Sequence, residues 1–409
     1  MKEGYKQTEL GIIPEDWEVK IAKDILSNYS LGGNYDNCLE ETSGIPLIKM
    51  GNINRGSIDL TKIEYLKEGT IYSENDILKR NDILFNTRNT LDLVGKVAIW
   101  RDELPFALYN SNLLRLKFKK EFISNNEFIN YLFNSRLILA KLRGYATGTT
   151  SVAAIYTKDL LKVKFPIPPI EEQNAIANCL STWDKAIEKQ QKLIEAKEIR
   201  HKALMQKLLS GKKRLPGFTD EWKEVKLGDL FSERNETKYD DLPLLSIGQE
   251  GVYPQTDSNK RDISNGDKSK YKRIVPGDIG YNTMRMWQGR SALSNLEGIV
   301  SPAYTILKSK ENVDSYFFSL LFKTTRLTNL FWRKSQGLVD DTLNCKYKDF
   351  SIIKCNIPSY EEQIAIKEIL KISGAEIEIE KKKVDQLKEQ KKALMQKLLT
   401  GKVRLPLNN

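Results

Sequence analysis

A sixteen-residue repeat constrains the fold of this chain more than any other feature of its sequence. Residues 201–216 read HKALMQKLLSGKKRLP and residues 391–406 read KKALMQKLLTGKVRLP, so the segments match at 13 of 16 positions and lie 190 residues apart. A match of this length at a fixed distance indicates two copies of one structural unit. We therefore predict a tandem duplication, in which the chain does one thing twice.

The repeat extends towards the N-terminus before the similarity fades. Glu171–Gln173 recurs as Glu361–Gln363 in the same register, and a tryptophan, Trp17 or Trp222, opens each half. Each copy is thus a divergent segment followed by a preserved one, as expected when a scaffold is kept and the binding surface on it changes. We expect a first variable domain at 1–165, a first helical spacer at 166–215, a second variable domain at 216–355 and a second spacer at 356–409.

Each preserved segment is predicted to form one long helix. The prolines of residues 166–169 break any preceding helix, and acidic side chains then occupy the first turn, as the helix dipole favours. Apolar residues follow at alternating steps of four and three, the heptad spacing of a coiled-coil seam. The seam residues are Ile176, Leu180, Trp183, Ile187, Leu204 and Leu208 in the first helix and Ile366, Leu370, Ile377, Val384, Leu387, Leu394 and Leu398 in the second.

Helix-stop residues set the length of both helices. Gly211 and Gly401 lie just past the expected ends and Pro216 and Pro406 beyond them, which gives helices of about 40 residues, or roughly 60 Å. The second variable domain must join the end of the first helix to the start of the second. Those points are neighbours only in an antiparallel pair, so we expect antiparallel helices with the variable domains in a pseudo-two-fold arrangement at opposite ends.

The variable domains are predicted to be mixed α/β domains with a mostly antiparallel sheet, which places the chain in the α+β class. In each, short β-rich runs alternate with turns before a helix. Expected strands cover 46–50, 82–85, 96–100 and 112–118 with a helix near 126–143, then 278–281 and 299–307 with a helix near 313–332.

The formal net charge of +11 indicates a polyanionic partner, most often nucleic acid. The repeated segments are themselves rich in lysine, however, and lysines suit a helix C-terminus whatever the partner. Charge alone therefore leaves nucleic-acid binding open.

The turns of the variable domains carry arginine, asparagine, glutamine and aromatic side chains. Arginine makes paired hydrogen bonds to guanine edges, and asparagine or glutamine to adenine edges. The same residue types are also common in ordinary solvated turns. The candidates for DNA contact are Asn52, Asn54, Arg55, Arg88, Asn89, Arg143, Tyr145, Thr149, Arg285, Trp287, Gln288, Arg290, Arg333 and Gln336.

The sequence lacks the motifs of several enzyme classes. It has no Walker A loop, no GxGxxG after a strand, no GxSxG and no Asn/Asp-Pro-Pro-aromatic run of the kind that amino-methyltransferases use. His201 is the only histidine, which disfavours Ser/His/Asp and HExxH chemistry. The four cysteines lack metal-ligand spacing and are expected to be reduced and buried. We expect no catalytic residue, no metal site and, without an apolar signal region or span, a cytoplasmic location.

Together these motifs closely resemble the specificity (S) subunit of Type I restriction–modification systems. The resemblance rests on PIPPIEEQ at 166–173, IPSYEEQ at 357–363 and the two LMQKLLxGKxRLP helix ends. GDIGYNTMRMWQG at 277–289 and RNDILFNTRN at 80–89 add to it, and it covers essentially the whole chain.

The resemblance implies two target recognition domains, each reading one half of a bipartite, asymmetric double-stranded DNA target. It also implies assembly with methyltransferase subunits, expected to be two, and with restriction subunits. The lack of an apolar span predicts no contact with a membrane. S-adenosylmethionine, ATP and magnesium would then bind the partner subunits, and this chain would bind no cofactor. Two alternatives remain, a free-standing bipartite DNA-binding regulator and a coiled-coil protein scaffold.

Overall fold

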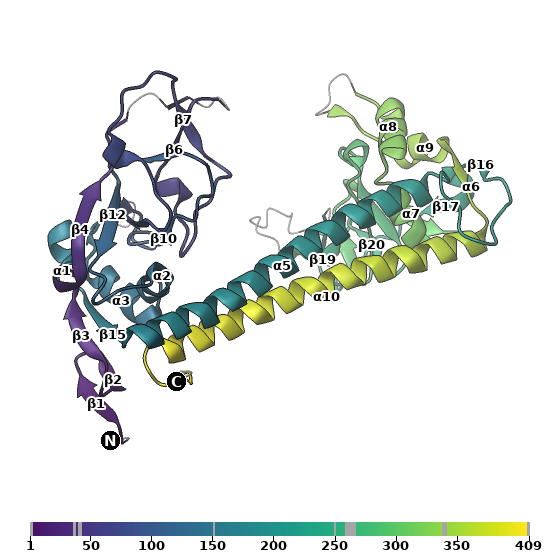
Figure 1. The fold of residues 1–409 in the computed structure, drawn as a ribbon. Coiled ribbons are helices and arrows are strands. Elements are labelled where there is room, and N and C mark those ends of the chain that lie inside the picture. Colours follow the sequence, from purple (N-terminus) through teal and green to yellow (C-terminus); the bar gives the residue numbers. More distant parts are fainter. Residues whose placement is uncertain are drawn as a thin grey trace. The chain divides into compact units, whose positions relative to one another are not determined.

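A computed structural model describes residues 3–35, 38–39, 43–149, 152–248, 251–257, 267–337 and 342–406 (Figure 1). The chain divides into two compact units. Unit 1 comprises Met1–Gln191 with Lys382–Asn409, and unit 2 comprises Lys192–Lys381. Each unit therefore holds one variable segment together with parts of both long helices.

Unit 1 is built on a four-stranded antiparallel sheet. Its strand order is β10 (Val97–Ile99), β8 (Ile83–Asn86), β12 (Leu113–Phe118) and β4 (Leu26–Leu31). One core packs this sheet against α2 (Asn126–Phe133) and α3 (Arg136–Tyr145). The other elements are β1 (Tyr5–Thr8), β2 (Gly11–Pro14), β3 (Glu18–Ile21), α1 (Ala22–Ile25), β5 (Cys38–Leu39), β6 (Ile45–Ile48), β7 (Glu64–Leu66), β9 (Arg88–Asn89), β11 (Leu108–Tyr109), β13 (Thr147–Gly148), β14 (Ala153–Ala154), α4 (Thr157–Leu160) and β15 (Lys164–Ile167).

Unit 2 repeats the same plan. Its four-stranded antiparallel sheet has the order β17 (Phe231–Glu233), β24 (Tyr304–Ser309), β21 (Ile279–Asn282) and β22 (Ser291–Leu293). The other elements are β16 (Lys223–Lys226), α6 (Leu227–Leu230), β18 (Leu245–Ile247), β19 (Val252–Pro254), β20 (Lys272–Ile274), β23 (Gly298–Val300), α7 (Ser315–Leu321), α8 (Thr325–Lys334), α9 (Tyr347–Ser351) and β25 (Lys354–Ile357). The sequence of elements confirms the tandem duplication.

Three expected elements are divided in the structure. The helix expected near 126–143 is two helices, because Ser135 caps a new one by accepting a hydrogen bond from the Ile138 N–H at 3.4 Å. The helix expected near 313–332 is divided likewise, with Thr324 as the second cap. The strand expected at 299–307 becomes β23 and β24, because Pro302 lies in a turn between them.

The two long helices are present at the predicted length. They are α5 (Ile170–Leu209) and α10 (Tyr360–Leu398), with 40 and 39 residues. Gly211 and Gly401 follow them in the left-handed conformation, with φ of 69° and 67°, as a helix C-terminus favours.

Within each unit the helix segments pack antiparallel. In unit 1 the start of α5, with Ile176, shares a core with Leu398 at the end of α10. In unit 2 Leu208 near the end of α5 shares a core with Ile366 near the start of α10. The predicted antiparallel packing is therefore confirmed in both units.

Seam residues differ in burial along the helices. Trp183, Leu204, Leu387 and Leu394 are half-buried. Charged pairs also join the two helices, such as Lys391 with Asp184 at 2.5 Å in unit 1. The buried seam residues are Ile176, Leu180, Ile187, Leu208, Ile366, Leu370, Ile377, Val384 and Leu398.

A buried glutamate joins each variable domain to the helices. In unit 1, Glu172 is 1% exposed and accepts hydrogen bonds from the Trp17 indole at 2.9 Å and from Arg404 at 2.6 and 3.0 Å. The sequence favoured a role with the helix dipole for this carboxylate. Its burial and its bidentate arginine instead make it the centre of a joint between three segments.

The same joint occurs in unit 2 with equivalent atoms. Glu362 accepts two hydrogen bonds from Arg214, both at 2.7 Å, and one from the Trp222 indole at 3.2 Å. Ser359 caps α10 by accepting from the Glu362 N–H at 3.4 Å. Ser359 and Glu362 have the spacing of a capping box, but only the serine half forms, since the structure records the Glu362 carboxylate with Arg214 and Trp222.

Candidate nucleic-acid interface

The end of one central strand is built alike in both copies. In unit 1 the Thr87 N–H and hydroxyl both donate to the carbonyl of Asn112, at 3.1 and 2.9 Å, and the Thr87 carbonyl accepts from the Ile155 N–H. In unit 2 the Thr283 N–H and hydroxyl donate to the carbonyl of Ala303, at 3.2 and 3.0 Å. A shared frame thus holds the chain at this point in both domains.

Beyond these threonines the two domains differ. In unit 1, β9 joins a three-stranded sheet of order β13-β14-β9, in which β14 lies between Arg88–Asn89 and Thr147–Gly148. In unit 2 the chain instead turns through a short 3-10 helix, Met286–Gln288, which packs against α8. Divergent side chains therefore stand on equivalent supports.

The structure brings several unit 1 candidates to the surface. Asn54, Arg88, Arg143 and Thr149 are exposed. Arg55, Asn89 and Tyr145 are half-buried.

Asn52 does not fit a DNA-contact role. Its side chain is 2% exposed, accepts from the Lys49 N–H at 2.9 Å and donates to the Asp59 carbonyl at 2.9 Å. Because its amide is used inside the loop, we assign Asn52 to holding the loop in shape.

The unit 2 candidates gather around the 3-10 turn and the end of α8. Gln288, Arg290, Arg333 and Gln336 are exposed, and Arg285 and Trp287 are half-buried. The Trp287 indole donates to the Met284 carbonyl at 3.2 Å, which fixes the ring against its own turn. Gly289 has a φ of 72°, and a Cβ built there would lie 3.3 Å from Thr328 of α8, so this turn requires glycine.

Further cations, which residue type alone did not indicate, lie near these candidates. In unit 1, burial and the nearby Arg55 lower the pKa of Lys96. Burial and Arg143 lower the pKa of Arg55 itself. In unit 2 a hollow of about 490 Å³ beside Met284 is lined by Lys272, Lys346 and Lys348 among others. The signal for Lys96 was its place opposite Asn86 in a hairpin, which only the register reveals.

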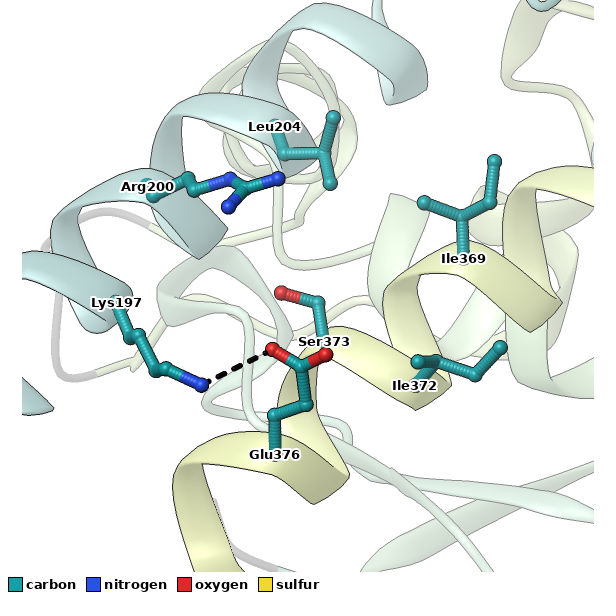
Figure 2. A pocket seen from close by; sticks show the side chains of 7 residues that line it. All are labelled: Lys197, Arg200, Leu204, Ile369, Ile372, Ser373 and Glu376. Carbon is teal, nitrogen blue, oxygen red and sulfur yellow. Dashed lines mark hydrogen bonds and ion pairs between the residues drawn. The ribbon is translucent and has the colours of Figure 1, made fainter. Parts of the chain in front are cut away.

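The helix pair of unit 2 carries a shallow groove of about 200 Å³ (Figure 2). Figure 2 shows Lys197 of α5 reaching Glu376 of α10, with their ion pair at 3.3 Å. Ile372 lines the groove and is 58% exposed, and Ile379, one heptad further along α10, is 65% exposed. An apolar stripe on a polar helix is a feature of protein contact surfaces.

The described residues hold no cluster of His, Cys, Asp or Glu that could bind a metal ion. Cys179, Cys345 and Cys355 are free thiols, and burial raises the pKa of Cys345 and of Cys355 to about 12, which keeps both protonated. The side chain of Cys38 lies outside the described residues. No helix in the described part of the chain is long and apolar enough to span a membrane.

Both halves of the chain match one protein family. The model of the type I restriction modification DNA specificity domain matches this chain twice, at residues 14–198 and 219–389. The chain belongs to this family. The two matches coincide with the two copies of the duplication, so each copy is one specificity domain and the protein is a type I specificity subunit.

Curated relatives span the full length of this specificity subunit. A putative type I restriction enzyme MjaX specificity subunit from Methanocaldococcus jannaschii is 30% identical and covers 99% of this chain and 97% of its own. The MjaVIII specificity subunit of the same organism is 26% identical over the same shares. Specificity subunits of this family are non-catalytic, so the protein is not itself an enzyme.

Solved structures of related subunits share the fold. The S subunit from M. genitalium superposes with a TM-score of 0.54 at 17% identity, covering 93% of this chain and 96% of its own. A chain from a structure of complex assembly in the type I R-M system gives a TM-score of 0.59 at 16% identity, covering 96% and 99%. The fold is thus kept while most of the sequence has changed.

Proposed function

We propose that this specificity subunit reads a bipartite, asymmetric DNA target, with one half-site contacted by each variable domain. The observation that carries the proposal is the pair of equivalent threonine supports, Thr87 and Thr283, followed by different side chains in the two domains. Equivalent supports favour the same approach to DNA, and different side chains favour different half-sites.

The candidate side chains suit this role in their chemistry. Arg88 and Arg333 are exposed arginines that can pair with guanine edges, and Gln288 and Gln336 are exposed amides that can pair with adenine edges. The net charge of +11 supports the general attraction to DNA. The domain bounds proposed with this function are 1–165 and 216–355 for the readers and 166–215 and 356–409 for the spacers.

We further propose that the subunit assembles with two methyltransferase subunits and, in the full complex, with restriction subunits. S-adenosylmethionine, ATP and magnesium would bind those partners. Methylation of adenines in a gapped target, present with this gene and absent without it, tests the proposal by single-molecule sequencing of the genome. A regulator would bind such a site without directing methylation, and a scaffold would not bind it.

Exchange of one variable domain should change one half-site only. Replacing residues 22–163 keeps β3 paired with β15 and leaves the joint of Trp17 with Glu172 intact. We expect a chimera with another specificity domain there to methylate a target with one new half and one old half. Methylome mapping checks this, and the reciprocal exchange of residues 227–353 should alter the other half. Changes in both half-sites from one exchange would show that the domains do not read independently.

The apolar stripe on α10 is the proposed contact for a methyltransferase subunit. Replacing both Ile372 and Ile379 by glutamine should weaken that association at least about 100-fold, since burying each isoleucine contributes about 1.5–3 kcal/mol. Lys371→Gln with Glu378→Gln, on the neighbouring face of the same helix, is the matched control. Titration of the labelled methyltransferase subunit measures its affinity for each double variant. If the two double variants bind it with equal affinity, the stripe is not part of the interface.

A further inference from the structure

Three cations from separate segments of unit 1 converge at one place. The Gly56 N–H donates to the Val97 carbonyl at 2.7 Å, which sets Arg55 beside Lys96. A Cβ built on Gly95 would lie 3.5 Å from Leu142 of α3, which sets the same hairpin against the turn that carries Arg143. A loop, a strand start and a helix end therefore supply one positive charge each.

Among the described residues, no carboxylate forms an ion pair with Arg55, Lys96 or Arg143. Arg55 donates from Nη2 to the Asp92 carbonyl at 3.1 Å, while its Nη1 is buried and has no partner in the described part of the chain.

The pKa values point the same way. Burial and Arg143 lower the pKa of Arg55, and burial and Arg55 lower the pKa of Lys96. By contrast, Arg101 makes two hydrogen bonds of 2.7 Å to Glu127. A buried guanidinium nitrogen among like charges lowers stability unless an anion is bound.

The second copy keeps one of these cations. The Asn86 N–H donates to the Lys96 carbonyl at 2.8 Å, and the Asn282 N–H donates to the Arg290 carbonyl at 3.3 Å. Arg290 therefore occupies the position of Lys96 in the other domain. A positive charge kept where the readers otherwise diverge fits a ligand that both half-sites share, and what all DNA sequences share is the phosphate backbone.

We infer that Arg55, Lys96 and Arg143 bind a phosphate of the DNA backbone and orient the first variable domain on its half-site. The inference rests on the proposed function and deepens it, because it separates residues that position the domain from residues that read bases. The half-buried Arg55 guanidinium, the neighbouring Lys96 and the exposed Arg143 carry N–H donors suited to the oxygens of a phosphodiester. Free inorganic phosphate has the same chemistry and is the other source of such an anion.

The test uses the full chain assembled with its methyltransferase subunits. Three variants, Arg55→Gln, Lys96→Gln and Arg143→Gln, are compared with wild type. Their affinities for the target sequence found by methylation mapping and for a random-sequence duplex are measured across a range of KCl concentrations. Each lost phosphate contact should weaken binding to both duplexes by the same factor. It should also reduce the slope of log affinity against log salt concentration by about 1. The ratio of wild-type to variant affinity should therefore fall about 3.5-fold between about 50 and about 200 mM KCl.

Arg80→Gln is the matched control. It removes the same charge from the same hairpin, at the end opposite Lys96, where Arg80 pairs with Asp102 at 3.1 Å. Its salt slope should equal that of wild type. Arg55→Gln breaks no ion pair, and relief of the repulsion among the three cations should offset loss of the hydrogen bond to the Asp92 carbonyl. The melting temperature should therefore change little, whereas loss of a merely structural arginine would lower it.

Three results would overturn the inference. The first is an unchanged salt slope in all three variants while wild type binds DNA. The second is a loss confined to the target duplex, or a changed methylated sequence, since either indicates a base contact. The third is stabilisation of wild type by inorganic phosphate that the variants lose while their DNA affinity is unaltered. A wild-type complex that binds no DNA would instead defeat the proposed function itself.

Discussion

A chain that ends at Leu215 is expected to form a stable dimer and to direct methylation to a target with inverted symmetry. Such a chain keeps the first variable domain and all of α5, but it loses α10. Ile176 and Leu180, which share a core with Leu398 in the full chain, would then face solvent. A second α5 packed antiparallel would cover them, because residues 201–216 match residues 391–406 at 13 of 16 positions.

The glutamate joint strengthens this expectation. Arg214 holds Glu362 with the same atoms that Arg404 uses to hold Glu172. In the dimer, Arg214 of one chain should therefore replace the missing Arg404 at Glu172 of the other. Truncation therefore removes no part of this joint that the first half cannot supply to a second copy of itself.

Light scattering gives the mass of the truncated chain, and methylation mapping with the methyltransferase subunits gives its target. Adding Arg214→Ala to the truncated chain should weaken the dimer, whereas Arg80→Ala should not. A folded monomer would contradict the shared helix surface. A methylated site without inverted symmetry would contradict the expected arrangement of two identical readers.

Glu172→Ala is expected to destabilise unit 1 by about 3 kcal/mol while leaving unit 2 nearly unchanged. Its removal strands a buried Trp17 N–H and deprives the Arg404 guanidinium of two hydrogen bonds. Glu171→Ala is the matched control, since Glu171 is exposed and should lose about 0.3–1 kcal/mol of helix-dipole stabilisation.

Hydrogen exchange measured peptide by peptide resolves the two units. Glu172→Ala should speed exchange in β3, β15 and the start of α5, whereas Glu362→Ala should speed exchange in β16, β25 and the start of α10. Equal effects of Glu171→Ala and Glu172→Ala would mean that the joint contributes nothing beyond the dipole.

The long helices were predictable because their signals are local. The proline run, the acidic first turn and Gly211 all lie next to the element that they delimit. The break at Ser135 was missed because apolar spacing continues through it from Phe133 to Ile138, and one serine is a weak signal. The role of Glu172 was missed because its partners lie 155 and 232 residues away.

The candidate site shows the same division. Residue type alone pointed to Arg55 and Arg143, and the structure shows them near each other. Residue type also pointed to Asn52, which is wrong because a loop amide can face inward as readily as outward. Lys96 could not be found from the sequence, since its importance depends on a hairpin register that pairs it with Asn86.

The division of the chain into units sets an order of events during synthesis. Unit 2 is continuous, from Lys192 to Lys381, whereas unit 1 needs Lys382–Asn409 to complete it. At about 5–20 residues per second, the ribosome makes Leu398 roughly 10–40 s after Leu180, its neighbour in the unit 1 core. The first domain to leave the ribosome is therefore the last to be finished, and its apolar helix face lacks its α10 partner throughout that interval.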